Sequence, residues 1–148
     1  AKPKGGAITF ITKEDTPLQL ISHKDIARFC VHALNADNND TFFINNTITL
    51  VGDIKSGNQI CGIIGKACNI SLEWKQFGLI IRAFMYNFVN KLENGGFRIK
   101  QNDIDKLKEI EPELWNFETF IQQNKACFDA ATIGGNKGAK KDNGCIIL

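Results

Sequence analysis

The strongest constraint on the fold comes from two segments that share a helix-start signal followed by apolar residues at helical spacing. Ser22 with Asp25 forms the first signal and Ser56 with Gln59 the second, each with the three-residue separation of a capping box. We therefore predict amphipathic helices over residues 23–35 and after Ser56. Asp25 would lie at the positive end of the first helix, where its replacement by alanine should cost about 1 kcal/mol. The apolar positions at i, i+3, i+4, i+7 and i+8 are Ile26, Phe29, Cys30, Ala33 and Leu34 in the first segment and Ile60, Ile63, Ile64, Ala67 and Cys68 in the second.

Short β-branched and aromatic runs flank these two helices. Residues 7–11 and 18–21 are expected as strands before the first helix. Residues 41–44 and 47–51 predict one broken strand or two short ones, and the alternation over residues 70–74 predicts a half-buried strand. The order strand, helix, strand, helix, strand is typical of an α/β fold.

The second half of the chain is predicted to be helical. Residues 77–92 are apolar on nearly all sides, which predicts a helix buried between neighbours and ended by Gly95-Gly96. A short charged helix is expected over residues 102–110, and Asn116 is positioned to cap a last one. With 148 residues there is room for one domain, expected over residues 1–131, followed by a polar and extended tail over residues 132–148.

The charge pattern and the cysteines exclude several classes of function. Eighteen Lys and Arg against sixteen Asp and Glu leave a formal charge of +2, without the basic face that nucleic-acid binding requires. Five cysteines are an odd number, and three of them occupy predicted apolar helix positions, which favours a reducing compartment. Neither His23 nor His32 has a Cys, His or carboxylate at a spacing that would converge on a metal, so no metal site is expected.

The stretch around the first helix start resembles a segment of NmrA-like and other atypical short-chain dehydrogenases. Residues 21–27 read Ile-Ser-His-Lys-Asp-Ile-Ala, which resembles the "I-S-x-x-D-[IV]-A" helix start of that family. The run 41–44, the turn at Val51-Gly52 and the helix after Ser56 then follow in the family's order.

Later segments extend the resemblance over residues 7–128. Asp103-Ile104 with Leu107 resembles the family's "D-[IF]-x-x-L-R", and residues 112–124 resemble "P-x-L-x-[ST]-F-E-x-W-L". The resemblance implies a partial Rossmann-like fold, the C-terminal portion of an atypical short-chain dehydrogenase, with a helical C-terminal segment. The chain departs from the pattern at Lys108, Asn116 and Phe120, where Arg, Ser or Thr, and Trp are usual.

The motifs that would make such a chain an enzyme are missing. A dinucleotide fingerprint needs glycines between a strand and a helix start, so that backbone amides approach a pyrophosphate. Gly62-x-x-Gly65 lies inside a predicted helix instead, and Gly134-Gly135-x-x-Gly138 lies in the polar tail. The single tyrosine, Tyr86, is followed four residues later by Asn90 and not by the lysine of a Tyr-x-x-x-Lys pair. We expect no catalytic residue, no cofactor-binding residue and no bound cofactor.

The last four residues, Cys145-Ile-Ile-Leu, match a lipidation pattern. They fit the C-a-a-X signal for prenylation, with Leu last as in geranylgeranyl transfer, and Cys145 is the candidate lipidation site. Lys137, Lys140 and Lys141 lie just upstream and could supply the basic patch that a single lipid chain needs for stable attachment. A short apolar end could equally dock in a groove of another protein.

These observations favour a non-catalytic structural or assembly subunit of a larger, membrane-associated complex. The complex would lie at a plastid or mitochondrial membrane, or at the cytoplasmic face of another membrane. Two alternatives stay open: the substrate-side half of a split NAD(P)-dependent reductase, and a prenylated adaptor tethered to a membrane surface. Other protein subunits are the expected partners, because apolar residues surround the 77–92 helix more widely than one core face requires. The interface residues we predict are Phe77, Ile81, Arg82, Phe84, Met85 and Phe88.

Overall fold

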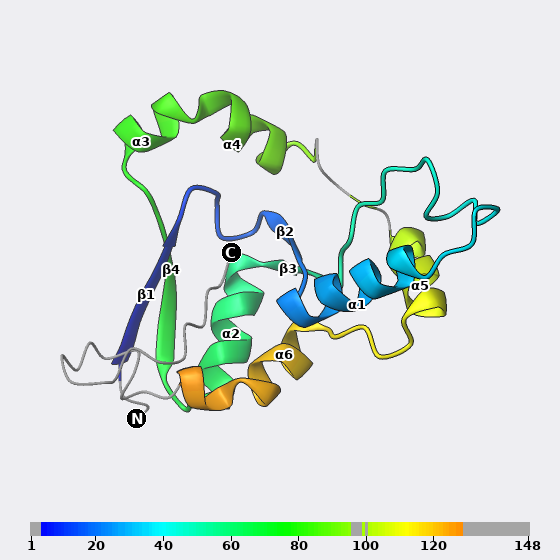
Figure 1. Cartoon of the computed structure of the whole chain (residues 1–148). Coiled ribbons are helices and arrows are strands. Elements are labelled where there is room, and N and C mark those ends of the chain that lie inside the picture. Colours follow the sequence, from blue (N-terminus) through cyan, green and yellow to red (C-terminus); the bar gives the residue numbers. More distant parts are fainter. Residues whose placement is uncertain (1–3, 96–98, 100, 129–148) are drawn as a thin grey trace.

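The computed structural model describes residues 4–95, 99 and 101–128, and it shows a mixed α/β protein with small sheets (Figure 1). The helices are confirmed at 101–110 and after Asn116, whose side chain accepts a hydrogen bond from the Thr119 amide. The elements in chain order are β1 (Lys4–Phe10), β2 (Pro17–Leu20), α1 (His23–Leu34), β3 (Asp53–Ser56), α2 (Gly57–Ala67), β4 (Ser71–Gln76), α3 (Leu79–Phe84), α4 (Tyr86–Glu93), α5 (Gln101–Ile110), α6 (Phe117–Gln123) and a 3-10 turn (Lys125–Phe128). The predicted tail, residues 132–148, lies outside the described residues.

Two separate pairs of strands form the sheets. β1 and β4 are parallel, with Ala7 opposite Glu73 and Phe10 opposite Gln76. Parallel strands need a long crossover between them, and α2 is part of that connection and packs against β4 (Figure 1). β2 and β3 are antiparallel, with Leu18 opposite Lys55. The α/β class and the strands expected near 7–11, 18–21 and 70–74 are confirmed.

Both predicted helix starts are confirmed. The Ser22 hydroxyl accepts a hydrogen bond from the Asp25 amide at 3.1 Å. At α2 the capping box is complete, because the Gln59 amide donates to Ser56 Oγ while the Ser56 amide donates to Gln59 Oε1 at 2.9 Å. The bonds to the two serine hydroxyls satisfy amides that a helix start leaves without partners in the helix, so both helices begin where the local sequence predicts.

The strands predicted at 41–44 and 47–51 are wrong. Residues 41–45 form turns, and the Asp40 carboxylate accepts hydrogen bonds from the amides of Phe42 and Phe43 at 2.8 and 3.1 Å. An aspartate that binds the next backbone amides favours a turn over a strand. Asn45, with a φ of 55°, turns the chain further. The strand of this region is β3, which begins after Gly52.

The single buried helix predicted over 77–92 is also wrong. Two short helices, α3 and α4, meet at Met85, whose φ of −99° and ψ of 18° interrupt the helix. Figure 1 shows the pair beyond the end of the β1–β4 strands, away from α2 and α6. Val89 is the one residue of α3 and α4 that is buried among the described residues. Gly95 follows with a φ of 78°, in keeping with the expected glycine stop, whereas Gly96 lies outside the described residues.

Two clusters of buried side chains hold the helices together. The first joins α2 to α6 and the 3-10 turn and consists of Ile60, Ile64, Phe117, Ile121 and Phe128. The second joins α1 to α5 and the segment after it and consists of Phe29, Leu107 and Leu114. Neither cluster includes a residue of α3 or α4, although Val89 of α4 is itself buried.

Candidate functional site

Large apolar side chains of α3 and α4 face solvent together. Leu79 is 84% exposed, Ile80 76% and Phe84 91%. Single exposed apolar residues are common on proteins, but many of them on two consecutive short helices are typical of an interaction site. We name this group the α3–α4 apolar surface, and its members are Phe77, Leu79, Ile80, Ile81, Phe84, Met85, Tyr86 and Phe88.

Five of the six predicted interface residues belong to this surface, and Arg82 does not. Arg82 Nη2 lies 3.0 Å from Glu93 Oε1, and Nη1 lies 3.3 Å from Gln76 Oε1. Only 24% of its side chain is exposed. Arg82 therefore joins α3 to α4 and to the end of β4, and its predicted place in an interface stays a prediction. Leu79, Ile80 and Tyr86 are members that the predicted set of interface residues did not include.

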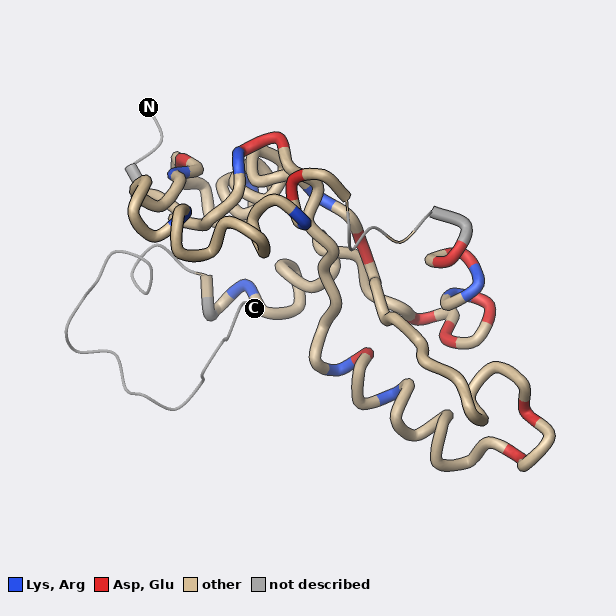
Figure 2. The backbone as a smooth tube through the Cα atoms, turned by 90° about the horizontal axis from the view of Figure 1, so that it is seen from above, with Lys and Arg blue, Asp and Glu red and all other residues tan. Residues whose placement is uncertain are grey.

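Charged residues are distributed over the rest of the described chain. Figure 2 shows Lys and Arg on several separate segments, interspersed with Asp and Glu. No helix within the described residues is long and apolar enough to cross a membrane.

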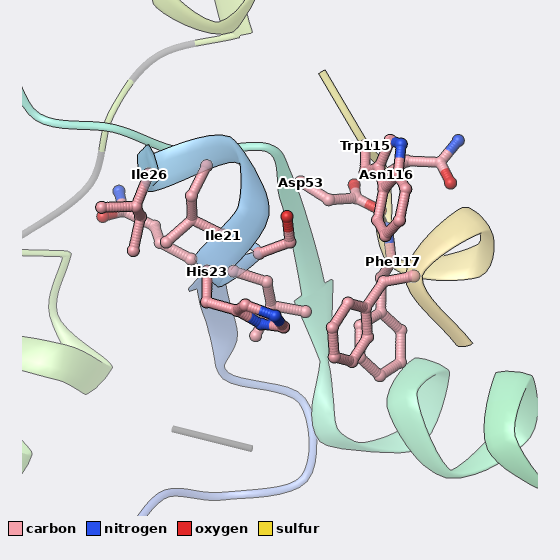
Figure 3. Close-up of a pocket in the computed structure, with 11 residues that line it drawn as sticks. Ile21, His23, Ile26, Asp53, Trp115, Asn116 and Phe117 are labelled. Atoms are coloured by element: carbon pink, nitrogen blue, oxygen red, sulfur yellow. Dashed lines mark hydrogen bonds between the residues drawn. The ribbon is translucent and has the colours of Figure 1, made fainter. Parts of the chain in front are cut away.

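A cavity of about 170 Å³ lies between the start of α1, β2, β3 and the start of α6 (Figure 3). Figure 3 shows Ile21, His23 and Ile26 on one side and Trp115, Asn116 and Phe117 on the other. No local sequence pattern predicts this cavity, because its walls come from segments as far apart as β2 and α6.

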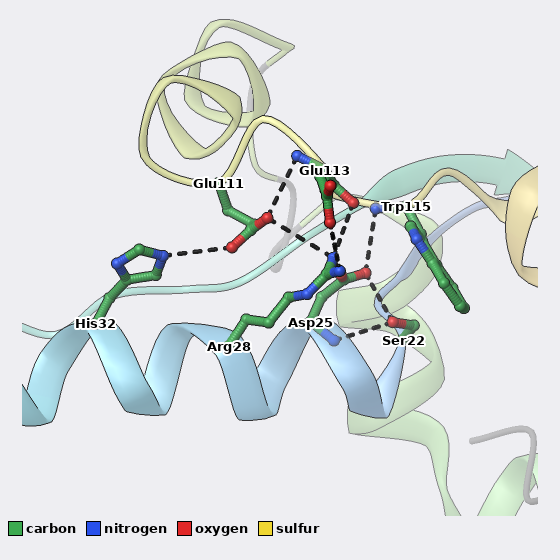
Figure 4. A network of polar contacts seen from close by, with 7 residues as sticks. All are labelled: Ser22, Asp25, Arg28, His32, Glu111, Glu113 and Trp115. Atoms are coloured by element: carbon green, nitrogen blue, oxygen red, sulfur yellow. Dashed lines mark hydrogen bonds and ion pairs between the residues drawn. The ribbon is translucent and has the colours of Figure 1, made fainter.

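A polar network beside the cavity centres on Asp25, which is fully buried (Figure 4). Its Oδ2 accepts hydrogen bonds from Ser22 Oγ at 2.7 Å and from the Trp115 amide at 3.2 Å. Its Oδ1 lies 3.3 Å from Arg28 Nη1, and Arg28 Nη2 lies 2.7 Å from Glu113 Oε2. Asp25 thus connects the start of α1 to the segment that leads into α6, as well as capping its own helix.

Three further titratable residues of the described part of the chain bear on a catalytic or metal role. His32 is partly exposed, and its Nε2 lies 3.3 Å from Glu111 Oε2. Cys30 is exposed and not packed as predicted, whereas burial raises the pKa of the Cys61 thiol, which makes it a poor nucleophile. Among the residues that the structure describes, no three His, Cys, Asp or Glu side chains could hold a metal ion together.

Two of the sequence features that relate to dehydrogenase chemistry, Gly62-x-x-Gly65 and Tyr86, lie within the described residues. Gly62 and Gly65 lie inside α2 and not at a helix start. Tyr86 is exposed at the first turn of α4. Cys145, the candidate lipidation site, and the glycines at 134–138 lie outside the described residues.

No model of a known protein family matches this sequence, and no curated protein matches it.

Proposed function

We propose that this chain is a non-catalytic structural or assembly subunit of a larger complex, and that it binds another protein subunit through the α3–α4 apolar surface. The observation that carries the proposal is the exposure of Leu79, Ile80 and Phe84 on α3, outside both core clusters. Met and aromatic residues are enriched in the buried centres of protein interfaces, and this surface contains Met85, Tyr86 and three phenylalanines. Burying such side chains against a partner would remove the free-energy cost of their exposure to water.

The charges of the helix pair favour a protein partner over direct contact with lipid. Helices that bind membrane surfaces usually carry many Lys and Arg on their polar face. α3 and α4 contain Arg82 and Lys91, and Arg82 is paired with Glu93. We propose that the complex is associated with a membrane. The α3–α4 apolar surface itself does not need to contact lipid for this.

We also propose that the chain represents the C-terminal part of an NmrA-like dehydrogenase fold. Three features support this: the serine-capped helices α1 and α2, the Val51-Gly52 turn between them, and the crossover from β1 to β4. A two-stranded parallel pair has an unpaired edge on each strand, and such edges are usually covered in native proteins. A partial fold of this kind would need another chain to cover its unpaired strand edges, which agrees with a subunit role.

Binding of a dye and of lipid vesicles to the purified chain tests whether the α3–α4 apolar surface binds a protein or a lipid surface. We expect the chain to bind the apolar-surface dye ANS and not to sediment with phosphatidylcholine vesicles. The double variant Leu79→Glu/Phe84→Glu should lose most of the dye signal with an unchanged far-ultraviolet circular dichroism spectrum, because both side chains lie outside the core. Leu34→Glu is the matched control, since Leu34 is 85% exposed on α1 and outside the surface. Vesicle binding that the double variant abolishes would instead make this a lipid-binding surface.

A further inference from the structure

Helix α1 turns most of its polar side chains toward the protein and most of its apolar side chains toward solvent. Figure 4 shows Asp25, Arg28 and His32 on the side of α1 that faces the segment of residues 111–115. All three side chains have partners in that segment. Phe29 is the one large apolar residue of α1 that is buried. A surface helix normally turns its charged side to water, so the orientation of α1 is the reverse of the usual one.

The solvent side of α1 is apolar along most of its length. From residue 26 to residue 34, every exposed side chain is apolar. Leu34 is 85% exposed, Val31 56% and Ile26 41%. We name this side the α1 apolar face, and its members are Ile26, Ala27, Cys30, Val31, Ala33 and Leu34. An apolar helix face of this kind is typical of a contact with another chain.

The α1 apolar face is symmetric in sequence about Cys30. Ile26 and Leu34 lie four residues before and after it, and Ala27 and Ala33 lie three residues before and after it. Residues three and four positions apart share one side of a helix. An antiparallel second copy with a two-fold axis at Cys30 therefore places Ile26 against Leu34 of that copy, and the two alanines meet in the same way.

The charges around the α1 apolar face also fit an antiparallel second copy. Lys24 is exposed at the start of α1, over the ring of Trp115, and Asp37 is exposed three residues after the end of the helix. Antiparallel pairing brings the start of one helix to the end of the other, so opposite charges and opposite helix-dipole ends lie near each other. A two-fold axis brings identical residues together, and no member of the face carries a charge that would repel its copy.

We propose that the α1 apolar face pairs with the same face of a second copy of this chain, in an antiparallel contact with its two-fold axis at Cys30. One helix face is smaller than the roughly 20 to 30 residues a side of a standard protein interface, so we expect a dissociation constant of about 0.1 to 1 mM. At micromolar concentrations the contact therefore does not form. A complex that holds two copies raises their local concentration to about the millimolar range, where the contact forms. This role in assembly rests on the proposed subunit function.

Charge substitution at the two-fold axis tests the contact by nuclear magnetic resonance under reducing conditions. The parent chain for these titrations is Leu79→Glu/Phe84→Glu, so that the α3–α4 apolar surface does not contribute. We expect the amides of Ala27, Cys30 and Leu34 to show saturable shifts as the parent is concentrated into the millimolar range. Cys30→Glu and Cys30→Lys, each added to the parent, should weaken association at least about fivefold, because like charges meet at the axis. A mixture of the two should restore the affinity to within about threefold of the parent.

The matched control pair is Gln122→Glu and Gln122→Lys, at an exposed position of α6, and neither these variants nor their mixture should change the affinity. Two results would overturn the proposal. Absence of concentration-dependent shifts at the α1 amides of the parent would mean that a second copy does not cover this face. A mixture of Cys30→Glu and Cys30→Lys that associates no more strongly than either variant alone would mean that the axis does not lie at Cys30.

The two tests separate this contact from the subunit proposal. The parent chain lacks two apolar side chains of the α3–α4 apolar surface, so failure of the α1 contact leaves the proposal for that surface standing. The dilution series of the parent needs no substitution at Cys30, so it remains decisive even where a Cys30 variant fails to fold.

Discussion

Replacement of Asp25 by alanine is expected to lower the free energy of unfolding by about 3 kcal/mol, as measured by urea denaturation. The carboxylate is fully buried and accepts hydrogen bonds from Ser22 Oγ and the Trp115 amide. Its loss leaves both donors without this acceptor and removes a charge that faces Arg28. This expectation exceeds the cost of about 1 kcal/mol that helix capping alone implies.

A second helix provides the control for this prediction. Asp103 is in the first turn of α5 but is exposed, so Asp103→Ala should cost only about 0.5 kcal/mol. Asp25→Asn should fall between the two alanine variants, since the amide retains an oxygen acceptor but not the charge. A loss of 1 kcal/mol or less for Asp25→Ala, in line with capping alone, would contradict the role of Asp25 in joining α1 to the segment before α6.

Alanine at Gly57 is expected to lower the free energy of unfolding by about 2 kcal/mol. A Cβ at this position would lie 2.4 Å from Cδ2 of Trp74, well inside van der Waals contact. The indole cannot withdraw without cost, because its Nε1 donates to the Thr12 carbonyl at 3.1 Å. The helix start and the tryptophan must therefore move apart.

Gly62 is the matched control within the same helix. A Cβ at Gly62 would meet no atom within 4 Å, and alanine favours helix over glycine. Gly62→Ala should therefore raise the free energy of unfolding by about 0.5 to 1 kcal/mol. The two variants should shift the thermal midpoint in opposite directions, and a shift in the same direction would be inconsistent with the packing of Trp74 on Gly57.

The parts of the fold that were predictable depend on interactions close in the sequence. The caps at Ser22 and Ser56 each involve residues three positions apart, so both helix starts follow from local pattern. The strands predicted over residues 41–44 and 47–51 were wrong because β-branched and aromatic residues favour strands, whereas the Asp40 carboxylate favours a turn there. β3 was missed because its polar sequence pairs with a strand more than thirty residues earlier.

The site depends on contacts that a local pattern does not contain. Asp25 was located correctly, but its bond to the Trp115 amide spans 90 residues. Arg82 stands among apolar residues in the sequence, yet the fold brings Glu93 to its guanidinium. The apolar residues of 77–92 were recognised, but their exposure follows from the break at Met85 and from the position of the pair outside both clusters.

Sedimentation velocity of the chain alone, compared with the Leu79→Glu/Phe84→Glu variant, tests most directly whether α3 and α4 form a partner-binding surface. We predict that the wild-type chain associates or aggregates as its concentration rises, because Leu79 and Phe84 have no cover in the isolated chain. The variant should sediment as a monomer and melt cooperatively. A wild-type chain that is itself a soluble, cooperatively melting monomer at every concentration would contradict the account.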